Sequence, residues 1–108
     1  MISVTQKNEI KIITALYNEL MSHQFTISVD DGEAINKTHS LSDMLDWYQN
    51  LDEMRLIAKK DDLKGSVYFI FGNGSKGIYC IIDNSEYLEP YMTKTNELTE
   101  QLCKKFDV

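Results

Sequence analysis

The sequence of 108 residues has little of what marks a specialised chain: two cysteines, one proline and no apolar run longer than five residues. The two cysteines, Cys80 and Cys103, are too few for a disulfide framework and lack the spacing of metal ligands. A membrane span needs about 18–20 apolar residues, and a run such as 67–71 is far too short. No basic and apolar leader opens the chain, so we expect a cytoplasmic protein without a membrane span.

Basic residues are also in short supply, because 11 Lys and Arg stand against 17 Asp and Glu, a net charge of −6. A protein that binds nucleic acid directly needs a basic surface for the phosphates, so we do not expect that function. The 43% hydrophobic and 26% charged composition is that of an ordinary globular chain. The length suits one domain over residues 1–108.

Hydrophobic spacing predicts three helices. Apolar residues at steps of three and four predict the first over residues 6–23, with Thr5 as its N-cap. The second is expected over residues 40–50, capped by Ser40. The third is expected over residues 89–106, because Pro90 fits only in the first turn of a helix.

Between these helices, period-two alternation and turn residues predict five strands. They cover residues 25–29, 33–37, 54–60, 67–71 and 78–82. Residues 67–71 are apolar on both faces, which favours a central strand paired with residues 78–82 through a hairpin loop. The connections are short, so we predict an α+β single domain in the order α-β-β-α-β-β-β-α. Its sheet should be antiparallel, with the helices packed on one face.

No motif in the sequence predicts catalysis. Residues 72–77 match G-x-G-x-x-G, but a strand follows where a phosphate site needs a helix N-terminus, so we interpret them as a hairpin loop. His23 fits the C-terminus of the first helix, and neither it nor His39 has metal-ligand spacing. Residues 30–33 lack the ligand spacing of a calcium loop. We therefore expect a non-enzymatic protein with no cofactor and no metal.

Acidic residues concentrate in one part of the chain. Residues 24–54 hold seven acids against the single base Lys37, whereas residues 55–82 have a surplus of basic residues. Such asymmetry can steer association with a basic partner, and tryptophan is frequent at binding hot spots. The plain alternative is a solvated face that only maintains solubility. The predicted partner-binding residues are Asp30, Asp31, Glu33, Asp43, Asp46 and Trp47, with Trp47 as the anchor.

One stretch carries a resemblance. Residues 67–98 contain an apolar strand ending in Gly72-Asn73, then Ile81-Ile82-Asp83, then Leu88-Glu89-Pro90 before a helix. This stretch, with residues 27–33, resembles a group of small uncharacterised bacterial and prophage-encoded proteins. The resemblance implies a bacterial or phage setting and assigns no functional residue.

We therefore expect an interaction protein that binds a protein partner with a basic surface. It would act as an inhibitor of that partner or as an accessory factor. One alternative is a nucleic-acid mimic that blocks a host defence enzyme, although the basic residues in 55–82 argue against it. Another is a small-molecule sensor, for which the aromatic residues Tyr68, Phe69, Phe71 and Tyr79 would line a cleft. A flat acidic surface around Trp47 would instead favour protein binding. The sequence leaves the oligomeric state open.

Overall fold

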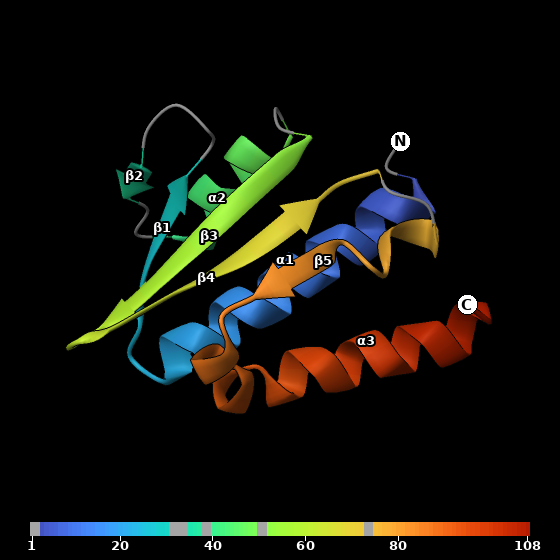
Figure 1. Cartoon of the computed structure of the whole chain (residues 1–108). Helices are drawn as coiled ribbons and strands as arrows, with labels where there is room; N and C mark the ends of the chain where they lie inside the picture. Colours follow the sequence, from blue (N-terminus) through green and yellow to red (C-terminus); the bar gives the residue numbers. More distant parts are fainter. Residues whose placement is uncertain (1–2, 31–34, 38–39, 50–51, 73–74) are drawn as a thin grey trace.

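The chain folds as a five-stranded antiparallel sheet backed by helices (Figure 1). The computed structural model describes residues 3–30, 35–37, 40–49, 52–72 and 75–108, and at 35–37, 47 and 75 it describes the backbone alone. The elements are α1 (Val4–Ser22), β1 (Thr26–Asp30), β2 (Ile35–Lys37), α2 (Leu41–Tyr48), β3 (Glu53–Lys60), β4 (Leu63–Ile70), β5 (Ile81–Asn84) and α3 (Thr93–Phe106). Two 3-10 turns, η1 (Ser75–Gly77) and η2 (Glu86–Tyr91), flank β5. The predicted α+β class and element order are confirmed.

The strands run in the order β2-β1-β3-β4-β5, and every neighbouring pair is antiparallel. In β3, Met54, Leu56 and Ala58 are buried, whereas Arg55 and Lys59 at the alternate positions are exposed. This alternation gives the sheet a covered face and an open face. In Figure 1, α1 and α2 lie behind the strands, α3 runs beside α1, and the open face is toward the viewer.

The core lies between α1 and the covered face. Its largest fully buried side chains are Phe69, Ile12, Ile13, Leu16, Leu20, Ile27, Met44, Met54, Leu56, Ile78, Leu88 and Met92. The sequence also predicts that α1 and α3 pack together, and they do, through buried residues that include Leu102. Leu98 of α3 lies at the edge of the cluster and is only partly covered.

The first helix begins earlier than predicted. Ser3, not Thr5, is the N-cap of α1, because the Ser3 hydroxyl accepts from the Gln6 N–H and the Gln6 side chain accepts from the Ser3 N–H. This reciprocal pair is a capping box, which satisfies two donors that the first turn leaves free. At the other end, His23 is the C-cap, as predicted, and its N–H reaches the carbonyls of Leu20 and Met21.

The last helix begins later than predicted. Pro90 lies inside η2, and the regular helix α3 begins at Thr93. Glu19 of α1 supplies the reason, because its carboxylate accepts the backbone N–H groups of Lys94 and Thr95, each at 2.8 Å, and the Thr95 hydroxyl at 2.8 Å. A cap from another helix thus fixes the start of α3, since Met92 at its N-cap provides no side-chain bond.

Strand β5 also differs from the prediction. The expected pairing of residues 67–71 with the next strand is antiparallel, as predicted, but the partner strand is Ile81–Asn84 rather than residues 78–82. The segment before β5 packs against α1 instead, and the Asn8 side chain donates a hydrogen bond to the Lys76 carbonyl at 2.9 Å. Ile78 and Cys80 are buried there without being part of a strand. β3 is the central strand of the sheet, and β4 lies next to it.

Candidate functional site

The open face of the sheet carries its side chains in three rows, because residues paired across antiparallel strands point to the same side. The first row contains Asp30, Arg55, Tyr68 and Asp83, the second Ser28, Ile57 and Ser66, and the third Thr26, Lys59 and Lys64. Charged groups therefore occupy the two outer rows, and small or apolar groups occupy the middle row. We call the surface formed by these three rows the open face.

Arg55 in the first row is held by its neighbours. Its guanidinium carbon lies 5.4 Å from the ring centroid of Tyr68. The Tyr68 hydroxyl donates a hydrogen bond to Glu53 Oε2 at 2.6 Å, and this bond raises the pKa of Tyr68 above its ordinary value. Because Glu53 fixes the ring and the ring attracts the cation, the Arg55 side chain has a preferred position on an otherwise solvated surface.

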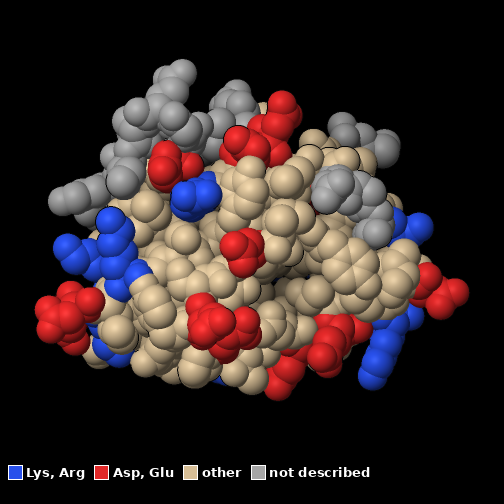
Figure 2. Space-filling view, in the orientation of Figure 1, with Lys and Arg blue, Asp and Glu red and all other residues tan. Residues whose placement is uncertain are grey.

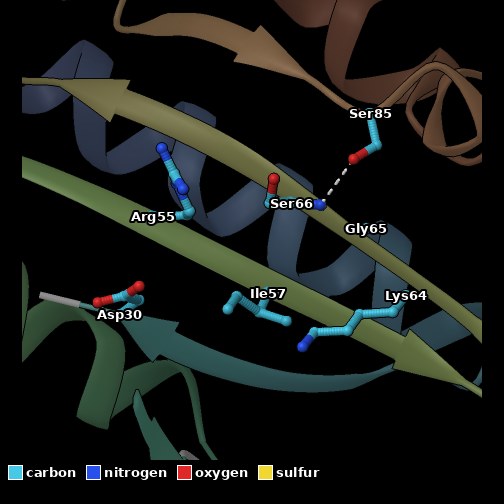
Figure 3. Close-up of a pocket in the computed structure, with 7 residues that line it drawn as sticks. All are labelled: Asp30, Arg55, Ile57, Lys64, Gly65, Ser66 and Ser85. Atoms are coloured by element: carbon cyan, nitrogen blue, oxygen red, sulfur yellow. Dashed lines mark hydrogen bonds between the residues drawn. The ribbon is translucent and has the colours of Figure 1, made fainter. Parts of the chain in front are cut away.

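A hollow of about 300 Å³ lies over the middle row (Figure 3). Its lining residues are Asp30, Arg55, Ile57, Lys64, Gly65, Ser66 and Ser85. Figure 3 shows the Lys64 side chain extending along β3 toward Ile57, with Asp30 on the opposite side of Ile57. Two cations, one carboxylate and two hydroxyls thus surround an apolar centre.

The far wall of this hollow is tied to the sheet beyond the end of β5. The Ser66 N–H donates to Ser85 Oγ at 3.0 Å, and the Ser85 N–H donates to the Ser66 carbonyl at 2.9 Å. Both bonds hold Ser85 in place against β4, and they leave its hydroxyl proton available to a further acceptor. The wall that Ser66 and Ser85 form is therefore fixed by these hydrogen bonds.

The third row places two like charges directly opposite each other, Lys59 on β3 and Lys64 on β4. Such a pair reduces the stability of a sheet. Figure 2 shows basic side chains on the side of the molecule where β3 and β4 meet, with acidic side chains at the turn itself and others across the middle of this view. Folding gains nothing from the lysine pair, which makes it a candidate for binding.

The predicted partner-binding residues fall on different parts of the molecule. Asp30 is half-buried in the first row of the open face. Asp43 and Asp46 are exposed on α2, and the backbone of Trp47 lies on the same helix. Asp31 and Glu33 lie outside the described residues.

Helix α2 does not share a surface with the open face. Its residues Met44 and Tyr48 belong to the core, and the Tyr48 hydroxyl donates to Glu9 of α1. Figure 1 accordingly shows α2 behind the strands. The structure therefore places Asp30 on one side of the sheet and Asp43 and Asp46 with the helices on the other, and a binding role for the α2 acids stays a prediction.

The four aromatic residues expected of a sensor do not line a common cleft. Phe69 is buried in the core, whereas Tyr68 points to the open face. Phe71 packs edge-on against Tyr48 with ring centroids 4.6 Å apart. Tyr79 is 46% exposed and accepts a hydrogen bond from the thiol of Cys103, a half-buried residue. Phe69 and Phe71 stack with ring centroids 5.6 Å apart, but Tyr68 and Tyr79 lie elsewhere, so the four rings do not form a ligand site together.

A second hollow, of about 450 Å³, lies beside the N-terminal half of α1 and includes the buried carboxylate of Glu9. Glu9 Oε1 accepts from the Tyr48 hydroxyl at 2.6 Å, and Oε2 accepts from the Gly72 N–H at 2.7 Å. Burial, followed by this hydrogen bond, raises the pKa of Tyr48. Since both oxygens of Glu9 are engaged, it joins α1 to α2 and to the loop after β4, and we assign it a structural role.

The packing against α1 also explains the last glycine of the glycine-rich stretch at residues 72–77. Gly77 has a φ of +76°, and a Cβ there would lie 2.6 Å from the Thr5 carbonyl oxygen. The stretch leads through η1 to β5, so no helix N-terminus follows that could bind a phosphate. Gly77 is thus required by its close approach to α1.

Other kinds of site find no support in the described part of the chain. Within residues 3–30, 35–37, 40–49, 52–72 and 75–108, no three His, Cys, Asp or Glu side chains are grouped to hold a metal. No helix among these residues is long and apolar enough to span a bilayer. Burial raises the pKa of the Cys80 thiol to about 12, which makes it a poor nucleophile at neutral pH.

Comparisons with protein-family models, curated proteins and solved structures find no match for this chain. Sequence reasoning found Asp30 on the open face but missed Arg55, Lys64, Ser66 and Ser85. The alternation of residues 54–59 does indicate that Arg55 and Lys59 point away from the core. What it cannot indicate is the register that brings them beside Lys64 and Ser66.

Proposed function

We propose that this protein is a non-enzymatic interaction protein that binds a protein partner through the open face of its sheet. The observation that carries the proposal is the hollow framed by Arg55, Lys64 and Asp30, with an apolar residue at its centre. Charged groups around a small apolar centre match the usual arrangement of protein interfaces, in which a polar rim surrounds a dry core. The net charge of −6 favours encounter with a partner that is basic overall.

An exposed sheet face alone would not support this proposal, because antiparallel sheets commonly leave one face in water. Two further features do. The Arg55 side chain is positioned by Tyr68 and Glu53, and the Lys59–Lys64 pair opposes folding. A side chain that is already positioned loses less entropy when a partner docks, and the lysine pair offers charges that folding does not use.

The same observations argue against the two alternative functions. A nucleic-acid mimic needs an uninterrupted acidic face, and Arg55, Lys59 and Lys64 interrupt this one. A sensor built on the four aromatic residues needs a common cleft, which their directions do not provide. Protein binding is therefore the function that we retain.

The test is affinity capture from lysate of the source organism with matched variants. The open-face variant is Arg55→Gln/Lys64→Gln, and the control Lys7→Gln/Lys11→Gln removes the same charge from exposed positions on α1. We expect one partner to be captured by the wild type and the control and to be lost with the open-face variant. Capture that is equal for all three proteins would contradict the proposal.

A third variant, Asp43→Asn/Asp46→Asn, tests the sequence-based role of α2. If its acids only steer encounter, the captured partner should associate more slowly at low salt, and this effect should disappear as exposed charges are screened. The dissociation rate should stay unchanged. A large increase in the dissociation rate would move the interface to α2.

A further inference from the structure

The charges around the hollow are unequal. Arg55 and Lys64 line it, Lys59 lies opposite Lys64, and the single carboxylate in the lining is Asp30. Among the residues that the structure describes, no ion pair engages Lys59 or Lys64. The basic side of the hollow is therefore suited to an anionic group from outside the chain.

We infer that the hollow receives the carboxylate of an Asp or Glu side chain presented by the protein partner, and that Arg55 and Lys64 hold it. This inference rests on the proposed function. Arginine binds a carboxylate with two parallel N–H groups, and lysine adds a second charge from the other side. The Ser85 hydroxyl donates its proton to the same carboxylate, because in its bond with the Ser66 N–H the Ser85 Oγ is only an acceptor.

The centre of the hollow supports the same occupant. Ile57 is half-buried and lies between Arg55 and Lys64 (Figure 3). The methylene groups of a Glu or Asp side chain can cover it and exclude water, which strengthens the charged hydrogen bonds around them. A partner would thus bury an apolar stem and a charged end at one position, as interface anchors do.

Two features favour a carboxylate over a phosphate. Asp30 is in the lining, and its negative charge opposes a dianion more strongly than a monoanion. At about 300 Å³ and open to water, the hollow is also at the lower limit for a site that encloses a separate small molecule. A side chain delivered by a docked protein needs no enclosure, because the rest of the interface holds it in place.

The test is an NMR titration of the ¹⁵N-labelled full chain with the peptide acetyl-Gly-Glu-Gly-amide. The matched probes are the same peptide with Gln for Glu and, separately, inorganic phosphate. We expect saturable shifts of the amides of Ile57, Ser66 and Ser85 with the Glu peptide only. Arg55→Gln and Lys64→Gln should each weaken binding roughly fivefold, the size expected of one exposed charge pair. Lys7→Gln/Lys11→Gln should leave it unchanged.

Several results would overturn the inference. Equal shifts with the Gln peptide would show that the carboxylate is not recognised, and tighter binding of phosphate would assign the hollow to a phosphate group. Shifts that follow protein concentration without peptide would make a second copy of the chain the occupant. If Arg55→Gln and Lys64→Gln each bind the Glu peptide as tightly as the wild type does, the anion binds elsewhere. The variants alter exposed side chains, and unchanged amide dispersion in their spectra would verify that they fold.

The failure of this inference can be separated from the failure of the proposed function. If the Glu peptide does not bind but capture of the partner still requires Arg55 and Lys64, only the carboxylate is wrong. If the peptide binds but capture ignores both residues, the anion site stands and the protein-binding role of the open face falls.

Discussion

The two faces of the sheet are built from the same strands, yet their residues meet different requirements. On the covered face, the row Val29, Leu56 and Val67 is fully buried, and every member contributes to the core. On the open face, the row Thr26, Lys59 and Lys64 contributes a charge repulsion instead. Under the proposed function, packing selected the first row and binding selected the second, and substitutions in the two rows test that division.

The largest expected effect compares neighbours on opposite faces. Leu56 is 0% exposed, so Leu56→Ala should lower the free energy of unfolding by about 2–5 kcal/mol. Ile57 is half-buried on the open face, so Ile57→Ala should cost less than about 1.5 kcal/mol. Urea denaturation measures both values. Similar losses at the two positions would show that the open face is packed against something as the covered face is.

The next effect concerns the helices on the covered face. Glu19→Ala removes the acceptor for two N–H groups of α3 and the Thr95 hydroxyl, and should cost about 2–3 kcal/mol. Glu97→Ala changes an exposed glutamate on α3 and is the control, with an expected cost within about 0.5 kcal/mol. Hydrogen exchange should also quicken in the first turn of α3 with Glu19→Ala alone. Equal stability of both variants would remove Glu19 as the cap.

A smaller effect has the opposite sign. Lys64→Glu turns the like-charged pair with Lys59 into an attractive one, so the free energy of unfolding should rise by roughly 0.2–1 kcal/mol. The same variant should lose the partner. A gain in stability together with a loss of binding is the signature of a residue kept for function, and a variant that is less stable than the wild type would contradict this reading.

The smallest effect is one of reactivity. At pH 8 the thiol of Cys80 is protonated, because burial raises its pKa to about 12, so iodoacetamide should spare it in the folded protein. Cys103 is half-buried and should be modified first. Mass spectrometry of the alkylated chain distinguishes the two sites. Rapid modification of Cys80 would mean that the core around the segment between η1 and β5 opens readily.

The division between the faces also marks what the sequence could predict. The alternation of Phe25, Ile27 and Val29 and the helical stripe through Leu16 identify the covered face correctly, because burial leaves a periodic record. The start of α3 and the position of β5 were missed. Both depend on contacts of α1 with residues far along the chain, Glu19 with Thr95 and Asn8 with Lys76, which local patterns do not record.

The candidate site was predictable in part for the same reason. The charge of Asp30 made it a predicted binding residue, but the predicted strand ended at residue 29, whereas β1 continues through Asp30. The lysine pair was not visible, because its members lie five positions apart and only the tight turn between β3 and β4 brings them face to face. The charge count of residues 24–54 treated Asp30 and the α2 acids as one group, whereas the sheet separates them.

The most direct test of the account is cross-saturation NMR on the labelled protein in complex with its captured partner. We expect the amides of Arg55, Ile57, Lys64 and Ser66 to lose intensity when the partner is saturated, while those of Leu41–Tyr48 keep theirs. Loss of intensity along α2 with an unaffected open face would contradict the account and would return the interface to the acidic helix.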